Sequence, residues 1–181
     1  MLFRSPRTVL ATGAGPIGLL GALLGVQLGL EVHVLDRTSS GPKPELVRDL
    51  GATYHSCSVA DVGFAPDVIM ECTGVGQVIS ESVAVIGANG VVCLAGVGHG
   101  GTIPKVATAD VASSAVLKNN VVFGSVNANK RHWYKAAEAL ARADRSWLAR
   151  LITRREQPES FAQALTRQPE DIKVVIQFSE V

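Results

Sequence analysis

Short apolar runs alternate with helical stretches along most of this chain. The runs that we interpret as strands are Thr8–Thr12, Val32–Leu35, Ala52–His55, Pro66–Cys72, Gly90–Ala95 and Asn120–Val126. Helices are expected after the first of these runs, from Ile17 onward, and at Pro44–Leu50, Gln77–Gly87 and Ala109–Lys118. Strands with so few polar residues are typical of parallel sheets that are buried on both faces. The pattern therefore predicts an α/β fold with a doubly wound parallel sheet of six strands.

The pattern changes after residue 128. Elements expected there are an amphipathic helix at Lys130–Arg142, its extension at Ser146–Leu151, a short helix at Pro158–Leu165 and a terminal strand at Asp171–Phe178. The terminal strand needs a partner, and the predicted sheet has no obvious vacancy for it. We therefore divide the chain into a domain at residues 1–128 and a C-terminal helix and strand appendage at residues 129–181.

A glycine motif follows the first predicted strand. It reads Gly13-Ala14-Gly15-Pro16-Ile17-Gly18, and the second predicted strand leads directly into the acid Asp36. This combination is the dinucleotide-binding fingerprint of the Rossmann fold. Gly13 permits the tight turn, Gly15 lets the backbone approach a pyrophosphate, and Gly18 allows the helix to pack closely on the strand. The phosphates would lie over the N-terminal amides of the helix.

Two neighbouring residues bear on the choice between NAD and NADP. Asp36 is placed to accept hydrogen bonds from the adenosine ribose, which favours NAD because a 2′-phosphate would meet a carboxylate there. Arg37 could pair with a 2′-phosphate or stack on adenine, or it could be a solvated loop residue. NAD is the favoured coenzyme, and use of NADP remains open.

Composition excludes several function classes. The chain has 181 residues, a net charge of +1, 47% hydrophobic residues and a mean hydropathy of +0.25. A nearly neutral chain gives no electrostatic reason to expect nucleic acid or an anionic membrane as a partner. Its longest apolar segment, Ile17–Leu30, is too short and too interrupted by glycine to span a membrane, and no signal peptide is recognised. Three cysteines without a CxxC pair indicate free thiols in the cytoplasm.

Three segments resemble the nucleotide-binding half of zinc-containing medium-chain alcohol dehydrogenases, most closely the glucose dehydrogenase branch. They are the glycine motif, Glu71-Cys72-Thr73-Gly74 after the fourth strand, and Gly124-Ser125-Val126-Asn127-Ala128-Asn129 after the sixth. The tail, with Ile152-Thr153, Phe161 and Ile172-Lys173, is similar to the closing segment of that family. The resemblance implies that zinc and most of the substrate pocket lie in a separate N-terminal domain that this chain lacks. The chain would then be an excised piece, a subunit or a stand-alone gene product.

The cofactor-binding residues that we expect lie on one edge of the sheet, where the strands end. They are Gly13, Gly15, Pro16, Ile17, Gly18, Asp36, Arg37, Thr73, Gly74, Gly96, Val97 and, from the resemblance, Asn127 near the nicotinamide carboxamide or the substrate. Asn129 is expected to cap the following helix, with His132 on its surface. No catalytic residue is expected within the chain.

No zinc site is expected either, because a catalytic zinc needs three converging protein ligands. Suitable side chains are scattered without ligand spacing, at Cys57, Cys72, Cys93, His33, His55, His99 and His132.

The first hypothesis is that the chain binds the cofactor of an NAD(P)-dependent dehydrogenase that oxidises a sugar or another alcohol by hydride transfer, and is incomplete as a catalyst alone. A second hypothesis is a dinucleotide sensor or interaction subunit without catalysis, which would associate with itself or with a missing catalytic domain. A methyltransferase using the same turn for S-adenosylmethionine is a third. Short-chain dehydrogenase chemistry is disfavoured because Glu138, not lysine, lies four residues after Tyr134.

Overall fold

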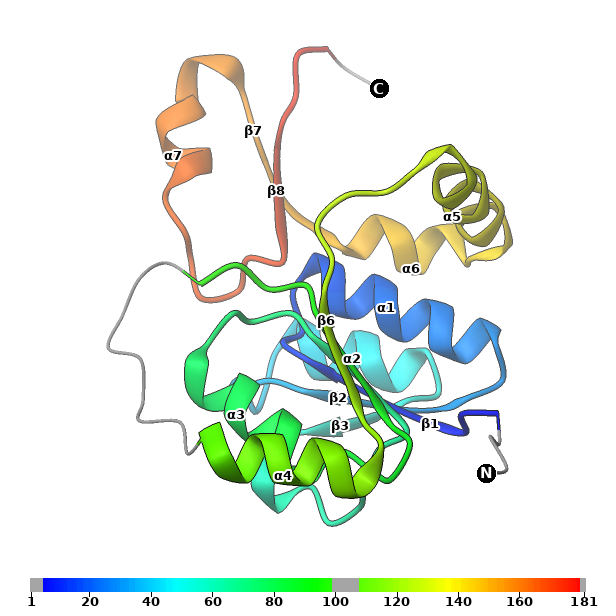
Figure 1. Ribbon diagram of the computed structural model, residues 1–181. Coiled ribbons are helices and arrows are strands. Elements are labelled where there is room, and N and C mark those ends of the chain that lie inside the picture. The colour runs from blue at the N-terminus through cyan, green and yellow to red at the C-terminus, as the bar shows by residue number, and fades with distance from the viewer. Residues whose placement is uncertain (1–4, 99–107, 180–181) are drawn as a thin grey trace.

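A six-stranded parallel sheet forms the centre of the protein (Figure 1), as the sequence predicts. The computed structural model describes residues 5–98 and 108–179. The strands lie in the order β3-β2-β1-β4-β5-β6, and each neighbouring pair is parallel. Their bounds are β1 Thr8–Thr12, β2 Glu31–Leu35, β3 Thr53–His55, β4 Val68–Glu71, β5 Val91–Leu94 and β6 Val121–Gly124.

Helices cover both faces of this sheet (Figure 1). Those on one face are α1 (Pro16–Gln27) and α2 (Pro42–Asp49), and those on the other are α3 (Gly76–Val85), α4 (Thr108–Lys118) and the short 3₁₀ helix η1 (Val59–Asp61). Alternation along β1 supplies both cores: Val9 and Ala11 pack with α1 and α2, whereas Leu10 packs with Val59 and residues around α3. Burial on both faces explains why the strands are apolar throughout.

The order of the strands creates a switch point between β1 and β4. From β1 the chain moves outward to β2 and β3, and then returns to place β4 on the other side of β1. The loops that follow β1 and β4 therefore leave the sheet toward opposite faces, and a crevice between such loops is the usual ligand site of this architecture.

The C-terminal segment adds a second, smaller sheet. Its elements are α5 (Lys130–Arg142), α6 (Arg145–Arg150), β7 (Ile152–Glu156), η2 (Pro158–Ser160), α7 (Phe161–Leu165) and β8 (Lys173–Ile176). Strand β8 pairs with β7 in parallel, which supplies the partner that the predicted terminal strand needed. Strand β7 is absent from the sequence prediction, because Arg154, Arg155 and Glu156 leave no apolar run to signal it.

Arg154 explains the polar character of β7. Its guanidinium forms a two-pronged contact with Asp171, an ion pair with Glu156, and hydrogen bonds to the carbonyl oxygens of Gln163 and Thr166. The hydrogen bonds that Arg154 donates to Asp171 and then to Glu156 raise the pKa of Arg154 well above its usual range. One side chain therefore ties both strands and helix α7 together.

Part of the C-terminal segment packs directly on the main domain. Trp147 of α6 is only 4% exposed, and its indole Nε1 donates a hydrogen bond to the carbonyl oxygen of Leu46 at 2.8 Å. Ile172, just before β8, is buried in the same core cluster. Arg150 pairs with Asp49 at the end of α2. The core on the α1–α2 face thus includes side chains from beyond residue 128.

Candidate dinucleotide-binding site

The glycine motif makes the tight turn that the sequence predicts. Gly13 has a φ of 92°, in the left-handed region, and a Cβ there would come within 2.9 Å of Thr73 Cγ2. A Cβ on Gly18 would overlap the carbonyl oxygen of Gly13, so helix α1 can lie against the turn only with glycine at this position. Gly15 differs, because a Cβ there would meet nothing within 4 Å. The second glycine borders open space and the other two are needed for packing.

Helix α1 begins beside that open space. Pro16 occupies its first turn, Gly15 is its N-cap, and no side chain caps the first amides. Ile17 is 52% exposed although it is apolar. An uncapped helix N-terminus next to a gap at a glycine suits an anionic group such as a pyrophosphate. The residues present therefore fit a dinucleotide.

The carboxylate of Asp36 lies close to the glycine turn. Its Oδ2 accepts a hydrogen bond from the backbone N–H of Ala14 at 2.8 Å, and its Oδ1 accepts one from the N–H of Thr38 at 3.1 Å. Lys43 donates to both oxygens, at 3.3 and 3.2 Å. Burial alone would raise the pKa of Asp36, but the two amides and Lys43 outweigh it and lower the pKa below its ordinary value.

Sequence reasoning missed Lys43, although its distance of seven residues from Asp36 and the intervening glycine offered a weak signal. Arg37, by contrast, is exposed to solvent beside Asp36. Tyr54 of β3 supports the same loop, since its hydroxyl donates to the carbonyl oxygen of Thr38. Burial, together with the charge of Asp36, raises the pKa of Tyr54 to about 12, so this hydroxyl stays a donor.

A second missed residue is Glu71, the last residue of β4. Its side chain is fully buried and accepts hydrogen bonds from the Thr12 hydroxyl and from the backbone N–H groups of Thr73, at 2.7 Å, and Gly74. The Thr73 hydroxyl donates to the same carboxylate. Glu71 thereby fixes the loop after β4 against the end of β1. Its position within a buried strand was the available signal, because an acid there must find partners.

The loops after β4 and β5 pack on each other through glycine. Gly74 has a φ of 67°, and a Cβ there would overlap the backbone nitrogen of Gly98. A Cβ on Gly96 would overlap the backbone nitrogen of Gly74. Val97, between Gly96 and Gly98, is largely exposed. The structure thus brings together the predicted residues that follow β1, β4 and β5, and the two loops approach as closely as backbones can.

Asn127 is exposed in the segment between β6 and α5. It follows β6, the outermost strand of the sheet, and therefore lies on the side where the strands end, as the glycine loops do. Asn129 caps α5 as predicted, because its Oδ1 accepts a hydrogen bond from the N–H of His132 at 3.1 Å. The role of Asn127 near a nicotinamide remains a prediction.

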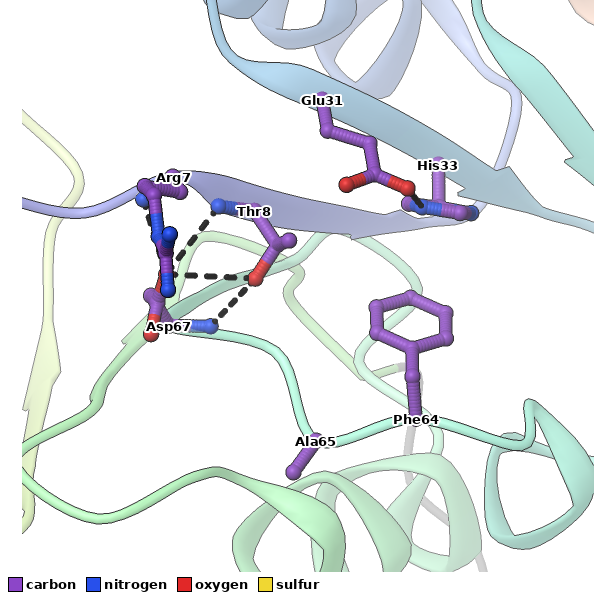
Figure 2. Close-up of a pocket in the computed structure, with 7 residues that line it drawn as sticks. All are labelled: Arg7, Thr8, Glu31, His33, Phe64, Ala65 and Asp67. Carbon is purple, nitrogen blue, oxygen red and sulfur yellow. Dashed lines mark hydrogen bonds and ion pairs between the residues drawn. The ribbon is translucent and has the colours of Figure 1, made fainter.

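A pocket of about 380 Å³ lies at the opposite edge of the sheet (Figure 2). Its walls come from the first residues of β1 and β2 and from the loop before β4, and its lining residues are Arg7, Thr8, Glu31, His33, Phe64, Ala65 and Asp67. Because strands β1, β2 and β4 are parallel, this pocket is separated from the glycine turn by the length of the strands. It is not part of the dinucleotide site.

Within residues 5–98 and 108–179, no group of three or more histidine, cysteine or acidic side chains is arranged to hold a metal ion. His99 lies outside these residues. Cys57, Cys72 and Cys93 are free thiols, and burial raises the pKa of Cys72 to about 12, with smaller contributions from Glu71 and Cys93. Among the described helices, none has the length and apolar character needed to cross a membrane.

Comparison with known proteins identifies the family. Residues 3–178 match the family described as "Glucose dehydrogenase C-terminus". The chain belongs to this family. A relative named glucose 1-dehydrogenase 2, from Vulcanisaeta moutnovskia, is 38% identical over 177 residues, which cover 95% of this chain and 50% of the relative. Glucose 1-dehydrogenase from Methanocella arvoryzae is 32% identical over 98% of this chain and 52% of its own length. The chain therefore spans about half the length of these curated relatives.

Solved structures agree with this assignment. Haloferax mediterranei glucose dehydrogenase in complex with NADP, Zn and gluconolactone superposes with a TM-score of 0.87 at 28% identity, over 99% of this chain and 53% of that one. An alcohol dehydrogenase from Thermotoga maritima gives a TM-score of 0.78 at 26% identity, over 94% of this chain and 49% of that one. The resemblance inferred from the sequence motifs is confirmed, as is the Rossmann-type fold.

Proposed function

We propose that this chain is the dinucleotide-binding portion of an NAD(P)-dependent dehydrogenase that oxidises glucose or a similar sugar. The observation that carries the proposal is the contrast within the glycine motif: Gly13 and Gly18 are needed for packing, whereas the space at Gly15 is open at an uncapped helix N-terminus. The glucose 1-dehydrogenases among its relatives support the substrate class. When bound, the nicotinamide would supply a hydride acceptor for the oxidation of an alcohol, and zinc held in another part of the full-length enzyme would supply the charge that polarises that alcohol.

The residues of this chain would bind and orient the coenzyme. The amides at the start of α1 would hold the pyrophosphate, and Asp36 and Arg37 would adjoin the adenosine ribose. The loop containing Thr73 and Gly74 would border the nicotinamide half, since it lies against the glycine turn. Gly96, Val97 and Asn127 would complete that wall on the same edge of the sheet.

Both coenzymes are consistent with the site. Asp36, at the end of β2, supports NAD, the coenzyme favoured from the sequence. The NADP bound by the Haloferax mediterranei enzyme supports the alternative. We infer that NAD is used and that NADP is also accepted. The three free cysteines support a cytoplasmic location.

A second candidate function is a dinucleotide-binding sensor or interaction subunit. It is favoured by apolar side chains that remain exposed, including Phe123 on the edge strand β6 and Trp133 on α5, which is 69% exposed. Exposed aromatic side chains and an open sheet edge are typical of surfaces that another polypeptide covers. Sedimentation velocity tests this second candidate function, since a strictly monomeric chain would count against an interaction subunit that associates with itself.

Calorimetric titration tests the proposed function. The purified chain is expected to bind NADH or NADPH and to ignore S-adenosylmethionine, which tests the methyltransferase alternative. Gly15→Leu should weaken dinucleotide binding by at least about tenfold, because its side chain would fill the open space. Ala136→Leu on the exposed surface of α5 is the matched control and should bind normally. Equal affinities in both variants would contradict the site.

A further inference from the structure

The contact between Lys43 and Asp36 is unusual for both residues. The Lys43 side chain is 6% exposed and that of Asp36 is 14% exposed, so the pair is largely removed from water. Lys43 also lies in the first turn of α2, where the helix dipole disfavours a positive charge. Gly41, the N-cap with a φ of 87°, turns the chain so that Lys43 returns to Asp36. A lysine that is both buried and placed against the dipole needs a carboxylate partner.

The carboxylate of Asp36 has no unused capacity in this arrangement. A carboxylate offers about four acceptor sites. Ala14, Thr38 and Lys43 together supply four donor contacts to its two oxygens. A ribose diol could therefore bind Asp36 only by displacing one of these donors. The acid is already engaged before any coenzyme arrives.

Positively charged side chains lie beside Asp36 at the end of β2. Lys43 neutralises Asp36, and Arg37 adds a positive charge on the exposed side. Glu170 reaches the same loop at Gly41, where its Oε2 would lie 2.6 Å from an added Cβ. Among the side chains bonded to Asp36, however, the only charge is that of Lys43. A 2′-phosphate approaching Asp36 would meet a compensated carboxylate instead of a free one.

We propose that Lys43 is a specificity-determining residue that allows this Asp-containing site to accept the 2′-phosphate of NADP as well as the 2′-hydroxyl of NAD. The inference rests on the proposed dinucleotide function and deepens it. Lys43 acts by compensating Asp36, and the exposed guanidinium of Arg37 contacts the phosphate directly. Removing Lys43 would restore the carboxylate's repulsion of NADP and release an acceptor for the ribose of NAD.

The test is a pair of fluorescence titrations with NADH and NADPH. The unmodified chain is expected to bind both within about tenfold of each other. Lys43→Met should weaken NADPH binding by at least about tenfold and change NADH binding by less than about threefold, and Lys43→Arg should restore NADPH binding. A merely structural role would weaken both coenzymes together. Lys135→Met, on the exposed surface of α5, is the matched control and should leave both affinities unchanged.

A second variant isolates the compensation of charge. The double variant Asp36→Asn, Lys43→Met should recover NADPH binding, because the charge that Lys43 compensates is gone. If Lys43→Met does not fold, Lys43→Gln decides instead, because it keeps a hydrogen-bond donor and removes the charge: a fall of at least about threefold in the affinity for NADPH relative to NADH supports the proposal, and a smaller fall overturns it.

Three further results would overturn the inference or the proposed function. An unchanged NADPH-to-NADH ratio in a folded Lys43→Met variant overturns the inference, as does an unmodified chain that binds NADH about a hundredfold more tightly than NADPH. An unmodified chain that binds neither coenzyme overturns the proposed function itself.

Discussion

The buried carboxylate of Glu71 accepts a hydrogen bond from the backbone N–H of Thr73 at 2.7 Å. The same carboxylate receives the Gly74 amide and the Thr12 hydroxyl, so one acid joins the end of β1 to the loop after β4. Thr73 in turn contacts the glycine turn, because its Cγ2 lies 2.9 Å from where a Gly13 Cβ would be. The geometry of the proposed coenzyme crevice thus depends on a side chain that is itself fully buried.

Replacing Glu71 by leucine should destabilise the chain. The substitution would leave the partly buried amides of Thr73 and Gly74 without their acceptor, at a cost of up to about 1–3 kcal/mol for each group. Denaturant unfolding monitored by circular dichroism measures this loss. Glu71→Gln is the control for side-chain shape. Its free energy of unfolding should lie between those of the original chain and Glu71→Leu, since it keeps one acceptor oxygen. A leucine variant as stable as the original chain would show that these hydrogen bonds contribute little.

Replacing Gly18 by alanine should move the glycine turn. The new methyl group would overlap the carbonyl oxygen of Gly13, so α1 or the turn must shift, at about 1–3 kcal/mol. Thermal unfolding and NADH titration should both show the change. Gly15→Ala is the companion variant, and its stability should be nearly normal because its methyl group enters open space. Equal melting temperatures for the two variants would contradict the close approach at Gly18.

Trp147 should contribute strongly to the stability of the main domain. Trp147→Ala removes a buried aromatic ring from the α1–α2 core and is expected to cost about 3–5 kcal/mol. Trp147→Phe retains most of the ring but leaves the Leu46 carbonyl oxygen without its donor, at about 1–2 kcal/mol. Chemical denaturation compares the two variants. Trp133→Ala on the exposed face of α5 is the control and should be almost neutral.

Mild acid should destabilise the folded chain through the histidine pair His33 and His55. His33 Nδ1 lies 2.9 Å from His55 Nε2, an arrangement that requires at least one neutral ring. Burial, and then the neighbouring His33, lower the pKa of His55 in the folded chain. The unfolded state therefore binds protons first as the pH falls below about 6.5, and stability decreases over that range. The melting temperature of His55→Gln should vary less between pH 7.5 and 5.5, and an identical pH dependence would contradict this origin.

The alternation of elements and the glycine motif were enough to predict the main sheet. Strands buried on both faces carry little except apolar residues, so β1 and β4 are visible in the sequence. Strand β7 could not be found this way, because Arg154 gives it a polar sequence. The contacts of Arg154 are with Asp171 and Gln163, which lie outside β7 and β8, so the pattern of neither strand indicates them. The pattern of apolar residues predicts which strands are buried, but it does not predict the ion pairs that stabilise a short, polar sheet.

The same limit applies to the site. The tight turn at Gly13 and the close packing at Gly18 could be predicted from the spacing of the glycines, because backbone geometry is local. The hydrogen-bond partners of Asp36 and Glu71 could not be predicted, since the sequence does not distinguish a hydrogen-bonded carboxylate from a free one. Lys43 shows the consequence most clearly, because it forms an ion pair with Asp36 although it does not belong to the fingerprint.

The position of Trp147 has a practical consequence for dissecting this protein. A piece cut after residue 128 would keep every strand of the large sheet and the whole glycine fingerprint, yet it would expose Leu46, Leu19 and their neighbours, which Trp147, Leu151 and Ile172 help to cover. We therefore expect the smallest piece of this chain that folds stably to include residues up to at least Ile172, beyond the last strand of the large sheet.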